Sequence, residues 1–99
     1  MEIIDRYRRA LKRRNCSLHT VKNYMNIVGH FTGWLKVPPA EVTRRNMAAY
    51  VDRLLRKRLK PKTITCHLQA IRLLFDYLID EEGIRMDNPV TRVSIRLPK

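Results

Sequence analysis

Apolar residues recur every three or four positions in four separate stretches of the chain, the spacing that places them on one face of an α-helix. The alternating pattern that indicates a half-buried β-strand does not occur. The pattern predicts helices over residues 3–14, 18–36, 44–58 and 61–82. We therefore expect an all-α domain without a sheet.

The residues at the ends of these stretches support the same boundaries. Ser17 and Thr43 are good N-caps, because a side-chain hydroxyl accepts a hydrogen bond from a free amide of the first helical turn. Pro61 suits the first turn of the last helix, where the amide hydrogen that proline lacks would have no helical partner. The "VPP" run stops the second helix, and Gly83 is expected to stop the fourth.

The last residues of the chain differ in character from the rest. Turn chemistry at Asn88-Pro89 is followed by a basic, extended run without a helical stripe. Ninety-nine residues are enough for one domain with a modest core. We expect that domain over residues 1–87 and the start of a flexible interdomain linker over residues 88–99.

The charge of the chain points to a polyanionic partner. Lysine and arginine number 21 against 9 aspartates and glutamates, a formal net charge of +12, and nucleic acid is the commonest partner of so basic a domain. Two cysteines make no disulfide framework, and the charged N-terminal segment is no signal peptide. No apolar run is long enough to span a bilayer, so we expect a cytoplasmic or nucleoid location and no membrane partner.

The sequence offers little for catalysis or metal binding. The four tyrosines lie on or beside the apolar stripes, the glycines form no phosphate loop, and the carboxylates are scattered apart from Asp80 to Glu82, which we interpret as a solvated helix end. Cys16 with His19 and Cys66 with His67 resemble half-sites for zinc. However, Cys66 and His67 point about 100° apart on a helix, and no C-x-x-C pair supports a metal site. We expect no cofactor, no metal and no catalysis by this chain alone.

Two stretches, residues 18–36 and 53–75, contain no carboxylate at all. The polar face of the first carries histidine, lysine and asparagine side chains, and the second is rich in lysine and arginine. A merely solvated surface would not exclude acids from two particular places, so the pattern favours contact with nucleic acid. These faces show no aromatic residue for stacking on unpaired bases, which favours duplex DNA.

The stretches "SLHTVKNYMNIVGHFTGWL" and "KTITCHLQAIRLLFDYLIDEEGIRMDNP" resemble the N-terminal core-binding domain of tyrosine recombinases, the superfamily of the phage integrases. The recurring elements are Ser17, Thr20, Tyr24, Phe31, Trp34-Leu35, Tyr50, Leu54, Thr63, Leu68, Ile71-Arg72, Phe75, Tyr77-Leu78 and Asn88-Pro89. The resemblance implies a SAM-like fold of four helices in two crossed hairpins. It also implies a role as one jaw of a clamp on duplex DNA, opposite a C-terminal catalytic domain that is absent from this chain.

In that family the starts of the second and fourth helices meet DNA. The matching positions and the acid-free faces together give the candidate DNA-binding residues His19, Thr20, Lys22, Asn23, Asn26, Lys60, Lys62, Thr63, Thr65, Cys66 and Gln69. The implied partners are double-stranded DNA, the catalytic domain of the same parent chain and other recombinase protomers on the DNA. The implied source is bacterial or phage-encoded, and the chain is expected to be a fragment of a DNA-cleaving and rejoining enzyme.

Alternatives remain open at this point. A helical protein-interaction module would use an apolar patch to dock a partner helix, and a helix-turn-helix regulator would dimerise on a palindromic site. Within the DNA-binding interpretation, the densest basic cluster lies elsewhere, at Arg8, Arg9, Lys12 and Arg13 of the first helix.

Overall fold

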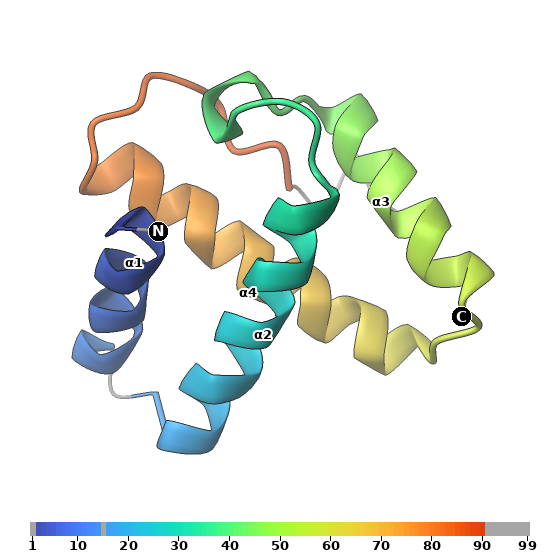
Figure 1. Ribbon diagram of the computed structural model, residues 1–99, viewed down its shortest axis with the longest axis horizontal. Helices are drawn as coiled ribbons and strands as arrows, with labels where there is room; N and C mark the ends of the chain where they lie inside the picture. Colours follow the sequence, from blue (N-terminus) through green and yellow to red (C-terminus); the bar gives the residue numbers. More distant parts are fainter. Residues whose placement is uncertain (1, 15, 91–99) are drawn as a thin grey trace.

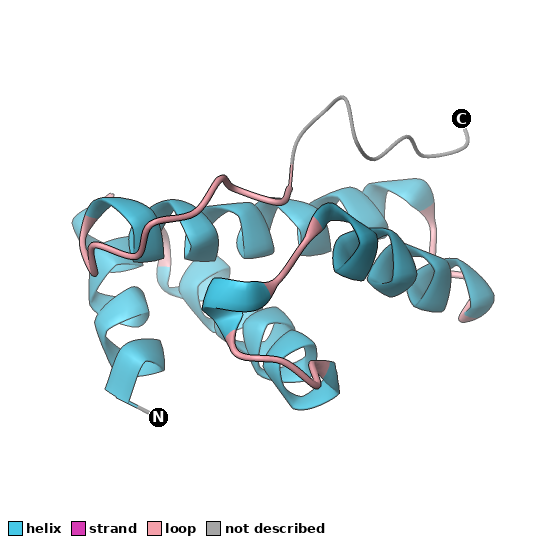
Figure 2. Ribbon diagram, turned by 90° about the horizontal axis from the view of Figure 1, so that it is seen from above, coloured by secondary structure: helices cyan, strands magenta, loops and turns pink. Residues whose placement is uncertain are grey.

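The computed structural model describes residues 2–14 and 16–90. Its elements are α1 (Glu2–Arg13), α2 (Leu18–Trp34), the short 3-10 helix η1 (Pro39–Glu41), α3 (Arg44–Arg56) and α4 (Pro61–Asp80). The described part of the chain contains no strand (Figure 2). The predicted all-α class and the four predicted helices are thus confirmed.

The predicted N-caps form as expected. The Ser17 hydroxyl accepts a hydrogen bond from the Thr20 amide at 3.1 Å. Thr43 and Asn46 cap α3 reciprocally: the Asn46 amide donates to Thr43 Oγ1 at 3.3 Å, and the Thr43 amide donates to Asn46 Oδ1 at 2.8 Å. These bonds satisfy amides that a helix start otherwise leaves without partners, so they fix where α2 and α3 begin.

The helices α2, α3 and α4 end slightly earlier than the periodicity indicates. Leu35 already has an extended backbone ahead of the prolines, and Arg58 takes a positive φ of 59° after α3. Gly83 has a φ of +72°, and the chain reverses there so that the Ile84 amide donates to the Leu78 carbonyl at 3.1 Å. Glycine adopts this conformation without steric cost, which explains its place after α4.

The four helices form two hairpins that cross. In Figure 1, α1 runs down to the turn that leads into α2, and α3 runs down to the turn that leads into α4. The hairpins meet where α2 lies across α4, and this helix pair has the most extensive packing in the molecule. The predicted arrangement of two crossed hairpins is therefore present.

Aromatic side chains lie at the centre of the core. The Phe31 ring packs edge-on against Tyr50 and Phe75, with ring centroids 5.0 Å and 6.2 Å away, and it stacks on Trp34 at 6.4 Å. Phe31 and Phe75 are fully buried and Tyr50 is 2% exposed. One ring of α2 therefore holds α3 and α4 together.

Charged side chains fasten α1 to the far end of α4. Arg6 Nη1 lies 2.6 Å from Glu82 Oε1, and Arg13 pairs with Glu81. Tyr77 donates its hydroxyl proton to Glu82 Oε2 at 2.5 Å; burial, followed by this bond, raises the pKa of Tyr77 to about 12. The bonds from Tyr77 and Arg6 lower the pKa of Glu82. The interpretation of this acidic run as a solvated end is wrong for Glu82, which Arg6 and Tyr77 bind, whereas Glu81 remains exposed beside Arg13.

The chain beyond Gly83 returns along the bundle. Asn88 Nδ2 donates to the Arg72 carbonyl at 3.1 Å and to Asp76 Oδ1 at 2.9 Å, and the Val90 amide donates to Asn88 Oδ1 at 2.9 Å. Val90 is 7% exposed, so the first three residues of the expected linker lie against the domain. The rest of that predicted linker, residues 91–99, lies outside the described residues. The boundary at residue 87 stays a prediction.

Replacing Asn88 by alanine is expected to lower the free energy of unfolding by about 1–2 kcal/mol, because the substitution removes hydrogen bonds that tie the returning chain to α4. Urea denaturation followed by circular dichroism measures this change. The matched control is Asp87→Ala at an exposed neighbour, with an expected change within about 0.5 kcal/mol. Equal effects of the two substitutions would contradict an anchoring role for Asn88.

Candidate nucleic-acid interface

The helices α2 and α4 meet one to two turns after their starts, at residues 43 positions apart in sequence, and their N-terminal ends diverge from this contact (Figure 1). Asn23 Nδ2 on α2 donates to the Cys66 sulfur on α4 at 3.4 Å. Burial, followed by the thiols of Cys66 and Cys16, raises the pKa of Tyr24. The two segments that the sequence predicts separately therefore meet at the Asn23–Cys66 contact, and we call their polar faces on either side of it the α2–α4 surface.

The predicted site residues are all accessible on this surface to some degree. Those that are exposed are His19, Lys22, Asn23, Asn26, Lys60, Lys62, Thr63 and Thr65. Those that are half-buried are Thr20, Cys66 and Gln69. The Thr20 hydroxyl also accepts a hydrogen bond from Ser17 Oγ at 2.9 Å, so it belongs to the cap of α2 as well. Contact between the predicted site residues and DNA stays a prediction.

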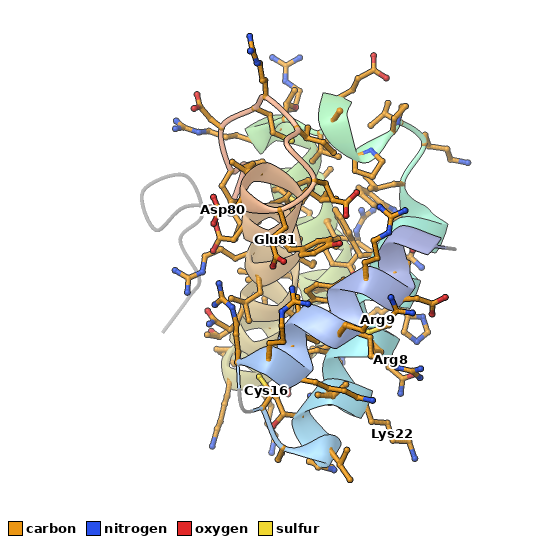
Figure 3. The ribbon with its side chains drawn as sticks, turned by 90° about the vertical axis from the view of Figure 1, so that its left-hand side faces the viewer. Arg8, Arg9, Cys16, Lys22, Asp80 and Glu81 are labelled. Atoms are coloured by element: carbon orange, nitrogen blue, oxygen red, sulfur yellow. The ribbon has the colours of Figure 1, made fainter. Side chains whose placement is uncertain are left out.

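The charge around the α2–α4 surface is one-sided. Neither α2 nor α4 has an acidic residue in its first turn. The free amides there carry partial positive charge, which adds to that of Lys22 and Lys62. In the view of Figure 3, Asp80 and Glu81 lie well apart from Lys22. No acidic residue in the first turn of either helix therefore neutralises these lysines.

A groove opens between α2, α3 and α4 beside this surface, with a volume of about 310 Å³. We call it the three-helix groove. Its polar lining consists of Asn23, Asn26, His30, Arg53, Lys57 and His67, over an apolar floor of Ile27, Tyr50, Leu54 and Leu59. No carboxylate belongs to this lining. The groove thus joins two predicted site residues, Asn23 and Asn26, to basic side chains of α3.

Sequence reasoning missed Arg53, Lys57 and His67 as site residues. Arg53 and Lys57 are four positions apart, the spacing that places two side chains on one helix face. That signal is present in the sequence, but the apolar stripe of α3 shows only which face is buried. It does not show that the polar edge of α3 meets α2 and α4.

His67 has an unusual environment at the wall of this groove. Its Nδ1 atom is buried and has no hydrogen-bond partner among the described residues. Burial, followed by the charges of His30 and Lys57, lowers the pKa of His67. The imidazole is therefore held neutral near pH 7.

The basic cluster of α1 is partly engaged in the fold. Arg13 pairs with Glu81, whereas Arg8, Arg9 and Lys12 are exposed. Figure 3 shows Arg8 and Arg9 on the same side of the molecule as Lys22. The cluster is therefore a competing basic surface with less free charge than its sequence suggests.

Comparison with known proteins identifies the family but gives no individual relative. Among the described residues, no helix is long and apolar enough to cross a bilayer. No curated protein and no solved structure gave a significant match. The family model described as "Phage integrase, N-terminal SAM-like domain" matches residues 3–84. This range covers all four helices except for Glu2, the first residue of α1. The matched region is the N-terminal domain of these integrases and not their catalytic domain. The chain belongs to the phage integrase family, of which it carries the N-terminal SAM-like domain.

Proposed function

We propose that this domain binds duplex DNA as the core-binding domain of a site-specific tyrosine recombinase, in DNA integration and recombination. The observation that carries the proposal is the Asn23–Cys66 contact, which brings the acid-free N-terminal halves of α2 and α4 together. Two helix N-termini and exposed lysines on one surface suit the phosphates of a duplex. Exposed amides, such as that of Asn26, suit base edges.

The domain positions DNA and leaves the chemistry to another part of the recombinase. Strand cleavage by a tyrosine needs an activated phenol and cations that stabilise charge on the scissile phosphate. Here burial raises the pKa of every tyrosine, namely Tyr7, Tyr24, Tyr50 and Tyr77. The proposed partners are accordingly duplex DNA, a C-terminal catalytic domain of the same parent chain and further protomers on the DNA, in the cytoplasm or nucleoid of a bacterium.

The salt dependence of DNA binding tests this proposal. If the domain engages about five phosphates, the logarithm of its affinity should fall against the logarithm of salt concentration with a slope of about −4 to −5. Fluorescence anisotropy with a labelled duplex over a range of salt concentrations measures this slope. A slope near zero, or equal affinity for heparin and DNA at all salt concentrations, would contradict specific use of a duplex.

An NMR titration of the labelled domain with duplex, together with the stoichiometry of binding, separates the two alternatives. A protein-interaction module would give no chemical-shift response when duplex is added to the labelled domain. A helix-turn-helix regulator would bind as a dimer and require a palindromic site. Monomeric, salt-dependent binding with shifts at the starts of α2 and α4 is the result expected for a core-binding domain.

A further inference from the structure

We propose that the three-helix groove is a phosphate-binding site that seats one phosphodiester of the duplex backbone, with Arg53 and Lys57 of α3 as its cationic ligands. This inference rests on the proposed function and extends the DNA-contacting region to a third helix. Neither side chain belongs to the predicted site. The groove would fix the register of the DNA on the domain, because a seated phosphate positions the backbone without reading sequence.

The lining of the groove suits an anion. Arg53 offers a planar fork of N–H donors and Lys57 a compact ammonium group, and both are exposed at the groove wall. Since no carboxylate belongs to this lining, a bound phosphate oxygen would meet the donors of Arg53 and Lys57 without repulsion.

A metal ion is a poorer occupant of the same space. His30 and His67 both line the groove, but within residues 2–14 and 16–90 no three side chains of metal-binding type gather at one place. A cation would also lie beside Arg53 and Lys57, whose charges repel it. The charge of the groove therefore selects an anion.

His67 supplies a donor that does not need to be charged. Its buried Nδ1 has no acceptor, and a buried N–H without a partner is more costly than a buried lone pair. In the neutral ring the proton is therefore better placed on Nε2, for which the described residues offer no hydrogen-bond partner either. An imidazole N–H in that position can donate to a phosphate oxygen.

The groove is continuous with the α2–α4 surface through one residue. Asn23 lines the groove, and its amide also donates to the sulfur of Cys66 at the start of α4. A DNA backbone lying along the α2–α4 surface would therefore reach the groove at Asn23. This continuity favours a phosphodiester over a free phosphate ion as the occupant.

Substitution on α3 tests the site directly. Arg53→Gln should weaken duplex binding about tenfold, the usual cost of losing a hydrogen bond to a charged group, and should make the salt slope shallower by about 0.9. The matched control is Arg56→Gln, since Arg56 is exposed on the same helix but does not line the groove. We expect the control to change affinity by no more than about twofold. Thermal unfolding of both variants verifies that each remains folded.

The titration of His67 is a second measurement of phosphate binding. If Arg53 had only a structural role, this titration would not respond to added duplex. The titratable and charged groups that share the groove with this ring are His30 on α2 and Tyr50, Arg53 and Lys57 on α3. In the free domain burial, followed by the charges of His30 and Lys57, lowers the pKa of His67. A seated phosphate adds negative charge that stabilises the imidazolium, so the pKa of His67 should rise when duplex is added and DNA binding should take up protons. Histidine NMR spectra across pH, with duplex and with inorganic phosphate as separate probes, measure this change.

The possible results separate the groove from the proposed function. If Arg53→Gln behaves as Arg56→Gln and duplex leaves the titration of His67 unchanged, the groove seats no phosphate, even though salt-dependent DNA binding persists. A response to inorganic phosphate but not to duplex would assign the groove to free phosphate and overturn the inference. If the unmodified domain binds no duplex at all, the proposed function itself fails.

Discussion

Replacing Phe31 by alanine is expected to lower the free energy of unfolding by about 3–5 kcal/mol, the range for removing a buried aromatic ring. Phe31 is fully buried, and its ring contacts Tyr50 on α3 and Phe75 on α4. The substitution therefore opens a cavity where the two hairpins cross. Because small domains are stable by only about 5–15 kcal/mol, this loss removes a large part of the total.

Urea denaturation of both proteins, followed by circular dichroism at 222 nm as the usual helix signal, measures the difference. The control is Gly29→Ala on the same helix. A β-carbon at Gly29 meets no atom within 4 Å, so this substitution should stabilise α2 by about 0.5–1 kcal/mol. A loss below about 1 kcal/mol for Phe31→Ala would show that the hairpins do not depend on this ring.

Local patterns predict the helices because a helix is a local structure. The 3.6-residue period marks buried positions such as Phe31 and Leu74, and the hydroxyl of Ser17 marks where α2 begins. Both signals need only neighbours within a few positions. The fastening of α1 to α4 depends instead on Arg6 and Glu82, which are 76 positions apart. No local pattern connects such residues, so the acidic run was interpreted as solvated.

The same limit explains which part of the candidate site could be predicted. The absence of acids at the starts of α2 and α4 is visible in the sequence, whereas the contact between Asn23 and Cys66 follows from the crossing of the hairpins. In the sequence pattern, Arg53 belongs to a polar helix face, and such a face is expected to be exposed to solvent. Only the angle at which α3 meets α2 and α4 converts that face into the wall of a groove. Sequence reasoning therefore found the acid-free helix starts but not the groove beside them.

Replacing Lys22 and Lys62 together by alanine is expected to weaken duplex binding about a hundredfold at low salt, with about tenfold from each. Both side chains are exposed near a helix start, and no acidic residue occupies the first turn of either helix. Each lysine is expected to contact a phosphate, so each single substitution should weaken binding similarly on all sequences and make the salt slope shallower by about one. The two effects should add, because the lysines belong to different helices.

Anisotropy titrations at several salt concentrations measure these changes, with Arg85→Ala as the control, because Arg85 is exposed beyond the acidic end of α4 and should matter little. Substituting Asn23 or Gln69 should instead alter the preference among sequences, if these amides reach base edges. The competing interpretation places the DNA on the basic residues of α1. If neutralising Arg8, Arg9, Lys12 and Arg13 abolishes binding while Lys22 and Lys62 prove dispensable, the DNA does not lie on the α2–α4 surface. That result would leave the family intact and move the interface to the basic cluster of α1.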